Sequence, residues 1–136
     1  MIITDDAGLT RILNTHRVIA MVGLSAREDR PSNSVARYLI ARGYTVIPVN
    51  PAASTILGQP CYASLQDIPV KVDMVDVFRK AADVPPIADA AIAIGAKSLW
   101  LQLGIINPAA AETASTAGLD VVMDRCPKIE YARLFG

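Results

Sequence analysis

A glycine turn followed by cations is the part of this sequence best suited to chemistry. Gly23-Leu24-Ser25 ends a short apolar run, and a charged loop that contains Arg27 and Arg30 follows it. Ser32-Asn33-Ser34 offers N-cap candidates for a helix that begins just after this loop. A helix N-terminus beyond a glycine turn presents unpaired N–H groups and a positive dipole end, both of which attract phosphate. The spacing therefore predicts a phosphate site at this turn.

The elements that must position this turn alternate between strand and helix along the whole chain. Strands are expected at 18–22, 44–49, 72–77, 98–103 and 119–123, and helices at 5–15, 32–42, 85–95, 107–118 and 128–134. This alternation predicts an α/β fold: a single doubly wound, Rossmann-like sheet of five parallel strands with helices on both faces. We expect the strand order 3-2-1-4-5, one domain over residues 1–136, and at most a short helix near residues 64–66.

The topology of the predicted sheet by itself indicates where a ligand binds. In open α/β sheets, ligands bind beyond the carboxyl ends of the strands, where the strand order reverses. In the expected order, this point lies between the first and fourth strands. Five cations collect at the strand ends of this edge, with ordinary solvated loop charge as the alternative explanation; they are Arg27, Arg30, Arg79, Lys80 and Arg125.

Two departures from the dinucleotide fingerprint argue against NAD as the ligand. The Gly-x-Gly-x-x-Gly pattern is reduced to Gly23, Ser25 and Glu28, which keeps one glycine of three. Asn50 stands where NAD enzymes carry the acid that holds the ribose hydroxyls. The chain also lacks the Gly-x-x-x-x-Gly-Lys-Ser/Thr loop of nucleotide hydrolases. A small NAD(P)- or other nucleotide-dependent enzyme is nevertheless kept as an alternative.

The sequence shows no catalytic constellation. His16 is the only histidine and precedes the first strand, away from the predicted cleft. Cys126 follows the fifth strand beside Arg125, an arrangement found at reactive thiols, and it leaves open a thiol-responsive interaction module. A packed structural cysteine is the alternative for this position. Asp76, inside the third strand, is expected to bond a nearby backbone or loop group.

The strand tips together resemble a known family. The chain resembles the stand-alone coenzyme A-binding domain proteins, which are similar to the amino-terminal domain of the succinyl-CoA synthetase α chain. The resemblance covers nearly the whole chain. The segments that carry it are Gly23-Leu24-Ser25, Arg30-Pro31-Ser32, Val49-Asn50-Pro51, Val77-Phe78-Arg79, residues 100–104 and residues 124–130.

The resemblance implies coenzyme A (CoA) or an acyl-CoA as ligand, bound by a module without catalysis. It assigns no ligase chemistry, since the synthetase's histidine-bearing domain has no counterpart here. The synthetase lysine that follows the second strand is also missing, which leaves the 3′-phosphate unassigned. The implied contacts are Gly23, Leu24, Ser25, Ala26, Arg27 and Arg30 for the pyrophosphate; Val49, Asn50 and Pro51 for the adenosine; Phe78 and Arg79 for adenine or the 3′-phosphate; Leu101, Gln102 and Leu103 for pantetheine; and Arg125 as a further cation.

Composition limits the other partners. Thirteen acids balance thirteen bases, so no net charge attracts nucleic acid or an anionic membrane. Two cysteines are too few for a disulfide framework or a zinc site. No signal peptide or membrane-length apolar run is visible, which favours a cytoplasmic location. The apolar, weakly charged chain is compatible with a homodimer.

Overall fold

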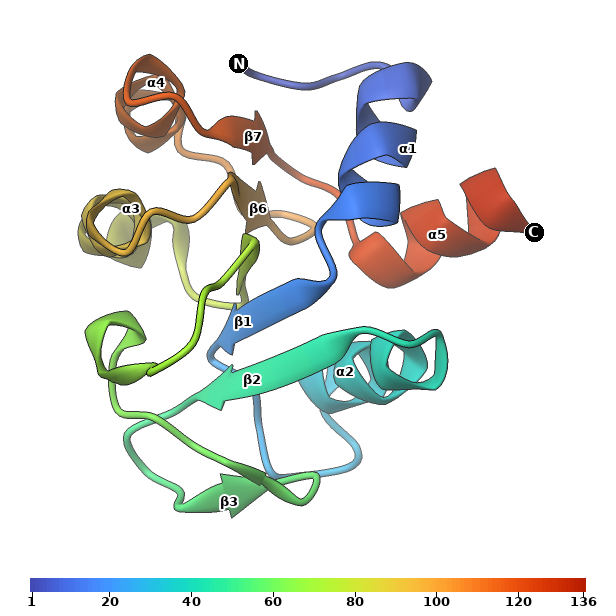
Figure 1. Cartoon of the computed structure of the whole chain (residues 1–136), viewed down its shortest axis with the longest axis vertical. Helices are drawn as coiled ribbons and strands as arrows, with labels where there is room; N and C mark the ends of the chain where they lie inside the picture. Colours follow the sequence, from blue (N-terminus) through green and yellow to red (C-terminus); the bar gives the residue numbers. More distant parts are fainter.

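A five-stranded parallel sheet forms the centre of the molecule (Figure 1). The computed structural model describes residues 1–136. The strands of this sheet are rich in Val, Ile and Leu and almost entirely buried, as expected for a parallel sheet covered on both faces. Their bounds are β1 Val18–Val22, β2 Thr45–Val49, β5 Met74–Val77, β6 Ser98–Leu101 and β7 Asp120–Val122.

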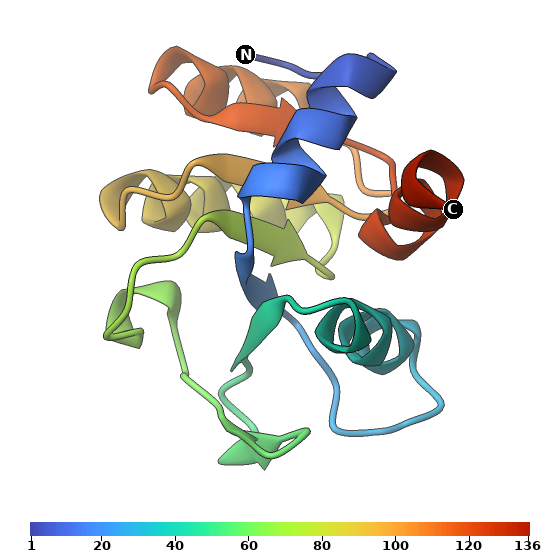
Figure 2. The same cartoon turned by 45° about the vertical axis from the view of Figure 1, so that its right-hand side comes forward.

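Helices cover both faces of the sheet, which confirms the doubly wound fold (Figure 2). On one face, α1, α2 and α5 enclose a core that includes Met21 and Trp100. On the other, α3 and α4 pack their small alanines against Val75 and Leu99. None of these helices is long and apolar enough to cross a membrane. Their bounds are α1 Asp6–Thr15, α2 Pro31–Ala41, α3 Val84–Ala93, α4 Pro108–Thr116 and α5 Pro127–Phe135.

Four short elements lie between the main ones, and of these only the first 3₁₀ turn was expected. Strands β3 (Thr55–Ile56) and β4 (Gln59–Pro60) form a small antiparallel hairpin beyond β2. Its turn residues Leu57 and Gly58 both have positive φ, as in a type I′ turn. Two-residue strands carry no alternating pattern, so sequence periodicity does not reveal them. The other two short elements are single 3₁₀ turns. One, Leu65–Asp67, lies near the expected short helix, and the other is Ala81–Asp83.

The expected strand order 3-2-1-4-5 is wrong in one respect. Counted along the chain, the five strands lie in the order 2-1-3-4-5, because β5 pairs with β1 on one side and with β6 on the other. The physical reason is Pro48 in β2, since proline has no N–H for a neighbouring strand and is confined to sheet edges. The carbonyl of Pro48 accepts the Tyr62 N–H at 3.1 Å on the outer side of β2. This makes β2 an edge strand.

The corrected order moves the point where the strand order reverses. It lies between β1 and β5, not between the first and fourth strands as expected. Val22 and Val77 are register partners at the carboxyl ends of these strands. The turn at Gly23 therefore lies directly beside Phe78 and Arg79, which the expected order would have placed beyond β2.

Candidate functional site

Three adjoining pockets follow the carboxyl edge of the sheet. The β1–β5 pocket, of about 450 Å³, lies between the ends of β1, β2 and β5 and the start of α3. The loop pocket, of about 320 Å³, lies at the start of α2, and the α2–α5 pocket, of about 740 Å³, lies between the starts of α2 and α5. The three pockets adjoin one another and are together called the groove: Gly23 and Ser25 line the first two, Pro31 and Phe78 line the second and third, and Arg79 lines the first and third.

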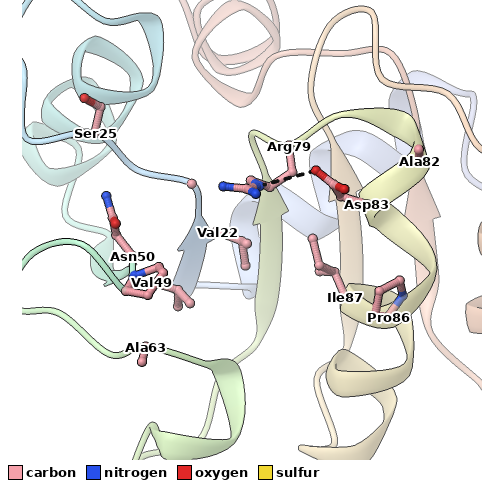
Figure 3. A pocket seen from close by; sticks show the side chains of 12 residues that line it. Val22, Ser25, Val49, Asn50, Ala63, Arg79, Ala82, Asp83, Pro86 and Ile87 are labelled. Atoms are coloured by element: carbon pink, nitrogen blue, oxygen red, sulfur yellow. Dashed lines mark ion pairs between the residues drawn. The ribbon is translucent and has the colours of Figure 1, made fainter.

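The β1–β5 pocket combines apolar walls with one cation (Figure 3). Val22 and Val49 come from the strand ends, and Ile87 faces them from α3. Arg79 projects into the pocket and forms an ion pair with Asp83, Nε to Oδ2, at 3.6 Å. Both side chains are about half exposed, so solvent screens this pair and leaves the guanidinium available to an anion.

Asn50 ties two strand ends together. Its Nδ2 donates to the Leu24 carbonyl at 3.0 Å, and its Oδ1 accepts the Ala52 N–H at 2.8 Å. Both ends of the amide are therefore used by the protein itself. In place of a ribose-binding acid, this position carries a residue that fixes the wall of the β1–β5 pocket.

Gly23 is required by the backbone at the β1 end. Its φ of +87° lies in the region that favours glycine, and its N–H donates to the Val49 carbonyl at 3.0 Å. A Cβ atom at this position would lie 2.6 Å from the carbonyl oxygen of Phe78 and 3.1 Å from Cδ of Arg79. The close approach of β1 and β5 therefore depends on the absence of a side chain here.

The loop pocket lies at the N-terminus of α2, but the helix begins differently from the prediction. Pro31 occupies the first helical position, with Arg30 as N-cap and no side-chain capping bond. Ser32 and Asn33 are buried in the first turn, where Ser32 Oγ accepts the Ser25 N–H and Asn33 Nδ2 donates to the Ser25 carbonyl. The expected N-cap residues thus hold the loop against the helix, and Arg27 and Arg30 line the pocket from its exposed side.

The α2–α5 pocket combines apolar walls with a cationic rim. Its charged lining consists of cations alone, and no Asp or Glu takes part. Lys128, in the first turn of α5, donates from Nζ to Ser34 Oγ of α2 at 3.0 Å. Gln102 is 8% exposed, and its Oε1 is buried with no hydrogen-bond partner. The lining residues are Pro31, Ser34, Val35, Phe78, Arg79, Lys80, Gln102, Leu103, Ile105, Cys126, Lys128 and Ile129.

The groove brings together most of the predicted contact residues. Eleven of the fifteen line at least one pocket: Gly23, Ser25, Arg27, Arg30, Val49, Asn50, Pro51, Phe78, Arg79, Gln102 and Leu103. The side chains of Leu24 and Leu101 are instead fully buried, on opposite faces of the sheet. Ala26 lines none of the pockets. Arg125 forms an ion pair with the buried Glu130.

Leu101 differs from expectation because strand alternation directs its side chain into the core. The Leu24 side chain is buried as well, but its expected contact with the pyrophosphate is through the backbone N–H. The Arg125 side chain is 35% exposed and is held by Glu130. Four further lining residues of the α2–α5 pocket were not among the predicted contacts: Lys128, Ser34, Ile105 and Ile129. These residues lie on helix starts and on the loop after β6, so only the packing of α5 against α2 reveals that they line a common wall.

Three groups that attract attention in the sequence lie in different places. His16 is buried at the opposite, amino-terminal edge, where Nδ1 lies 2.8 Å from Ser98 Oγ and burial lowers the pKa of the ring. Cys126 is 5% exposed in the wall of the α2–α5 pocket, at the N-cap position of α5. Asp76 lacks the well-formed backbone or loop hydrogen bond that was expected, although the Val77 backbone N–H favours its charged form. Both of its oxygens are buried without partners, and burial raises its pKa to about 8.

Metal-ligand side chains do not cluster in this structure. No group of three or more His, Cys, Asp or Glu side chains is placed to hold a metal ion. The groove offers shape, apolar surface, two helix N-termini and cations. These features suit an elongated ligand with anionic and apolar parts.

The comparison with known families assigns the chain. Residues 17–132 match the family described as "CoA binding domain", and the chain belongs to this family. The resemblance to CoA-binding domain proteins is therefore confirmed.

Individual relatives agree with this assignment. An uncharacterized protein of Bacillus subtilis, YneT, is 36% identical over 128 residues, which are 94% of this chain and 95% of YneT. The structure of a hypothetical protein from Pyrococcus horikoshii is 40% identical, with a TM-score of 0.95, and the match covers 98% of this chain and 94% of that one. Acetate–CoA ligase (ADP-forming) I of Archaeoglobus fulgidus is 28% identical over 120 residues, 81% of this chain but 18% of the ligase.

Proposed function

We propose that this protein binds coenzyme A or an acyl-CoA along the groove at the carboxyl edge of its sheet. The observation that carries the proposal is the order of surfaces along the groove. A pocket with apolar walls at β1 and β5 adjoins a cationic pocket at a helix N-terminus, and this adjoins a larger pocket with apolar walls and a cationic rim. CoA has the same sequence of parts: adenosine, diphosphate and pantetheine. Membership of the CoA binding domain family supports this ligand.

The diphosphate fits the loop pocket. There the uncapped N-terminus of α2 supplies a positive dipole end, and Arg27 and Arg30 supply charge. Arg27 also forms an ion pair with Asp29, both side chains being more than half exposed. Arg30 forms none and is the freer of the two cations.

Adenosine fits the β1–β5 pocket between Val22, Val49 and Ile87. Arg79 is the cation in this pocket and replaces the missing lysine after β2 as partner of the 3′-phosphate. For Arg79 to bind the phosphate in place of Asp83, only a solvent-screened ion pair has to be lost. Pantetheine then passes Phe78 and Pro31 into the α2–α5 pocket.

The proposed role is that of a binding or regulatory module. Acetate–CoA ligase (ADP-forming) I, a relative whose name states an activity, is more than five times as long as the segment that matches this chain. The groove of this chain holds no histidine and no paired carboxylates. The proposal includes a soluble, cytoplasmic protein of one domain. It also includes a homodimer formed through exposed apolar side chains such as Ile106 and Phe135, which light scattering tests.

Titration calorimetry with CoA, dephospho-CoA, NAD and AMP tests the proposal. We expect CoA to bind most tightly and dephospho-CoA more weakly, because only CoA offers the 3′-phosphate to Arg79. Absence of heat with millimolar CoA, together with clear binding of NAD, would overturn the assignment and favour a nucleotide-dependent enzyme.

A second candidate function rests on the place of Cys126 in the α2–α5 pocket. A thiolate there would attack CoA disulfide, form a protein–CoA mixed disulfide and release one CoA thiolate. Mass spectrometry after incubation with CoA disulfide tests this thiol-responsive role. An unmodified Cys126 would exclude it, and Cys126→Ser identifies any adduct formed on Cys61 instead.

A further inference from the structure

We infer that the α2–α5 pocket takes the acyl group of a coenzyme A thioester and prefers an acyl chain that ends in a carboxylate. The inference rests on the proposed function, because this pocket continues the groove assigned to CoA. Its chemistry, however, is argued from the residues of the pocket alone.

The pocket is larger than the thiol end of pantetheine requires. Its volume of about 740 Å³ is within the range of roughly 300–1,000 Å³ typical of small-molecule sites. Val35, Ile105 and Pro31 contribute apolar walls. Leu103 and Ile129 at its mouth are 53% and 52% exposed, and an apolar chain in the pocket would cover them. The space and the walls therefore fit an acyl chain of several carbons.

The charges of the pocket select among acyl chains. Its three charged residues, Arg79, Lys80 and Lys128, are all cations. Arg79 pairs with Asp83, whereas neither Lys80 nor Lys128 forms an ion pair. The pocket therefore holds two ammonium groups without a carboxylate, which a neutral acyl chain would leave uncompensated.

Lys128 is the better placed of the two lysines. Its Nζ is held by Ser34 Oγ at 3.0 Å and lies 5.6 Å from the centre of the Tyr38 ring. These contacts fix the ammonium group between α2 and α5, so less side-chain entropy is lost when it binds an anion. Its position in the first turn of α5 adds the positive end of that helix dipole.

Gln102 provides a second, independent sign of a ligand. Its side chain lines the pocket and is 8% exposed, yet its Oε1 is buried without a hydrogen-bond partner. An unsatisfied buried amide is costly, and such groups in native proteins are rare. A ligand that donates a hydrogen bond to this oxygen, such as an amide N–H of the pantetheine arm, would remove that cost.

Titration calorimetry on the full chain with succinyl-CoA and butyryl-CoA tests the preference. Both acyl groups have four carbons, and only the first ends in a carboxylate. We expect succinyl-CoA to bind about fivefold more tightly than butyryl-CoA. The ratio should approach one in Lys128→Met and stay at the wild-type value in Lys71→Met, an exposed lysine at the other edge of the sheet. Measurement of a ratio within each variant cancels any general change in affinity.

The outcomes separate this inference from the proposed function. If CoA binds but the two acyl-CoAs bind equally, the carboxylate preference is wrong and the CoA site stands. A wild-type ratio that survives in both Lys128→Met and Lys80→Met also overturns it. If neither free CoA nor an acyl-CoA binds, the proposed function itself fails. Circular dichroism establishes that each variant is folded, and Lys80→Met carries the test if Lys128→Met is not.

Discussion

At the scale of single residues, the groove depends on side chains with different duties. Asn50 and Ser32 use their polar groups on the protein and shape the walls. Arg30 and Lys128 have no carboxylate partner and face the groove. Position along the sequence does not separate these two groups, because both lie at strand ends and helix starts.

Gly23→Val is expected to destabilise the protein as well as to disturb the groove. The new Cβ would lie 2.6 Å from the Phe78 carbonyl oxygen at a φ of +87°. The positive φ alone costs about 1–2 kcal/mol for a residue with a side chain. Gly104→Val is the matched control, since its φ is +78° but no atom lies within 4 Å of its Cβ position. Urea denaturation should show a larger loss for Gly23→Val; equal losses would mean that the contact with Phe78 is readily relieved.

Arg30→Ala is expected to weaken CoA binding about threefold at low salt, the size of effect typical of an exposed charge. Arg30 is exposed in the loop pocket at the N-terminus of α2. Because salt screens such a charge, the difference from wild type should shrink as ionic strength rises. Calorimetry at two salt concentrations measures it, with Arg11→Ala at the other edge as control. An unchanged affinity in Arg30→Ala would place the diphosphate elsewhere.

At the scale of secondary-structure elements, β5 decides where the groove forms. It lies in the centre of the sheet, where its residue Asp76 is in register with Met21 on β1 and with Trp100 on β6. The carboxyl end of β5 leads into Phe78 and Arg79, which lie beside the Gly23 turn. Strand β2 is kept at the edge by Pro48 and is closed by the segment around Tyr62. An edge proline thus determines which strand ends meet.

Asp76→Asn is expected to change how stability depends on pH. Burial raises the pKa of Asp76 to about 8 from 3.8, so the folded protein holds a proton that the unfolded chain releases. This contribution to stability is complete below about pH 4 and is lost as pH rises to about 8, at most roughly 1.4 kcal/mol per pH unit. The amide does not titrate, so the variant should gain stability relative to wild type as pH rises.

Thermal denaturation from pH 5 to pH 8 measures this difference. Asp89→Asn, on the exposed side of α3, should follow the wild-type profile throughout. Parallel profiles for Asp76→Asn and the wild type would show that Asp76 is not protonated in the folded protein. His16 acts in the opposite direction, because its lowered pKa removes stability below about pH 6.5, but it is unchanged in both variants.

At the scale of the whole molecule, the two helical layers meet the groove in different ways. The layer of α1, α2 and α5 places two helix N-termini on the groove, whereas α3 contributes an apolar wall. A ligand that lies across the groove would contact both layers and the central sheet. Binding is therefore expected to stabilise the fold as a unit.

CoA is expected to raise the unfolding free energy by about 2.7 kcal/mol when present at one hundred times its dissociation constant. The physical reason is that the groove exists only in the folded state, where the ends of β1, β2 and β5 are brought together. Thermal scans at increasing CoA concentration should show a steady rise in midpoint. AMP at the same concentration serves as the control and should produce a smaller rise. No rise with CoA would contradict the proposed site.

The sequence by itself determined the fold class, the bounds of the main elements to within a few residues, and eleven of the 26 residues that line the groove. These follow from local physics: apolar runs, glycine stops and the prolines that begin α3, α4 and α5. The tertiary structure alone decided the strand order, the buried places of Leu24 and Leu101, and the junction of α2 with α5 at Lys128. These depend on contacts between residues far apart in the chain, such as Lys128 with Ser34, and no local pattern encodes such pairings. Pro48 is the exception, since its missing N–H marks an edge strand within the sequence itself.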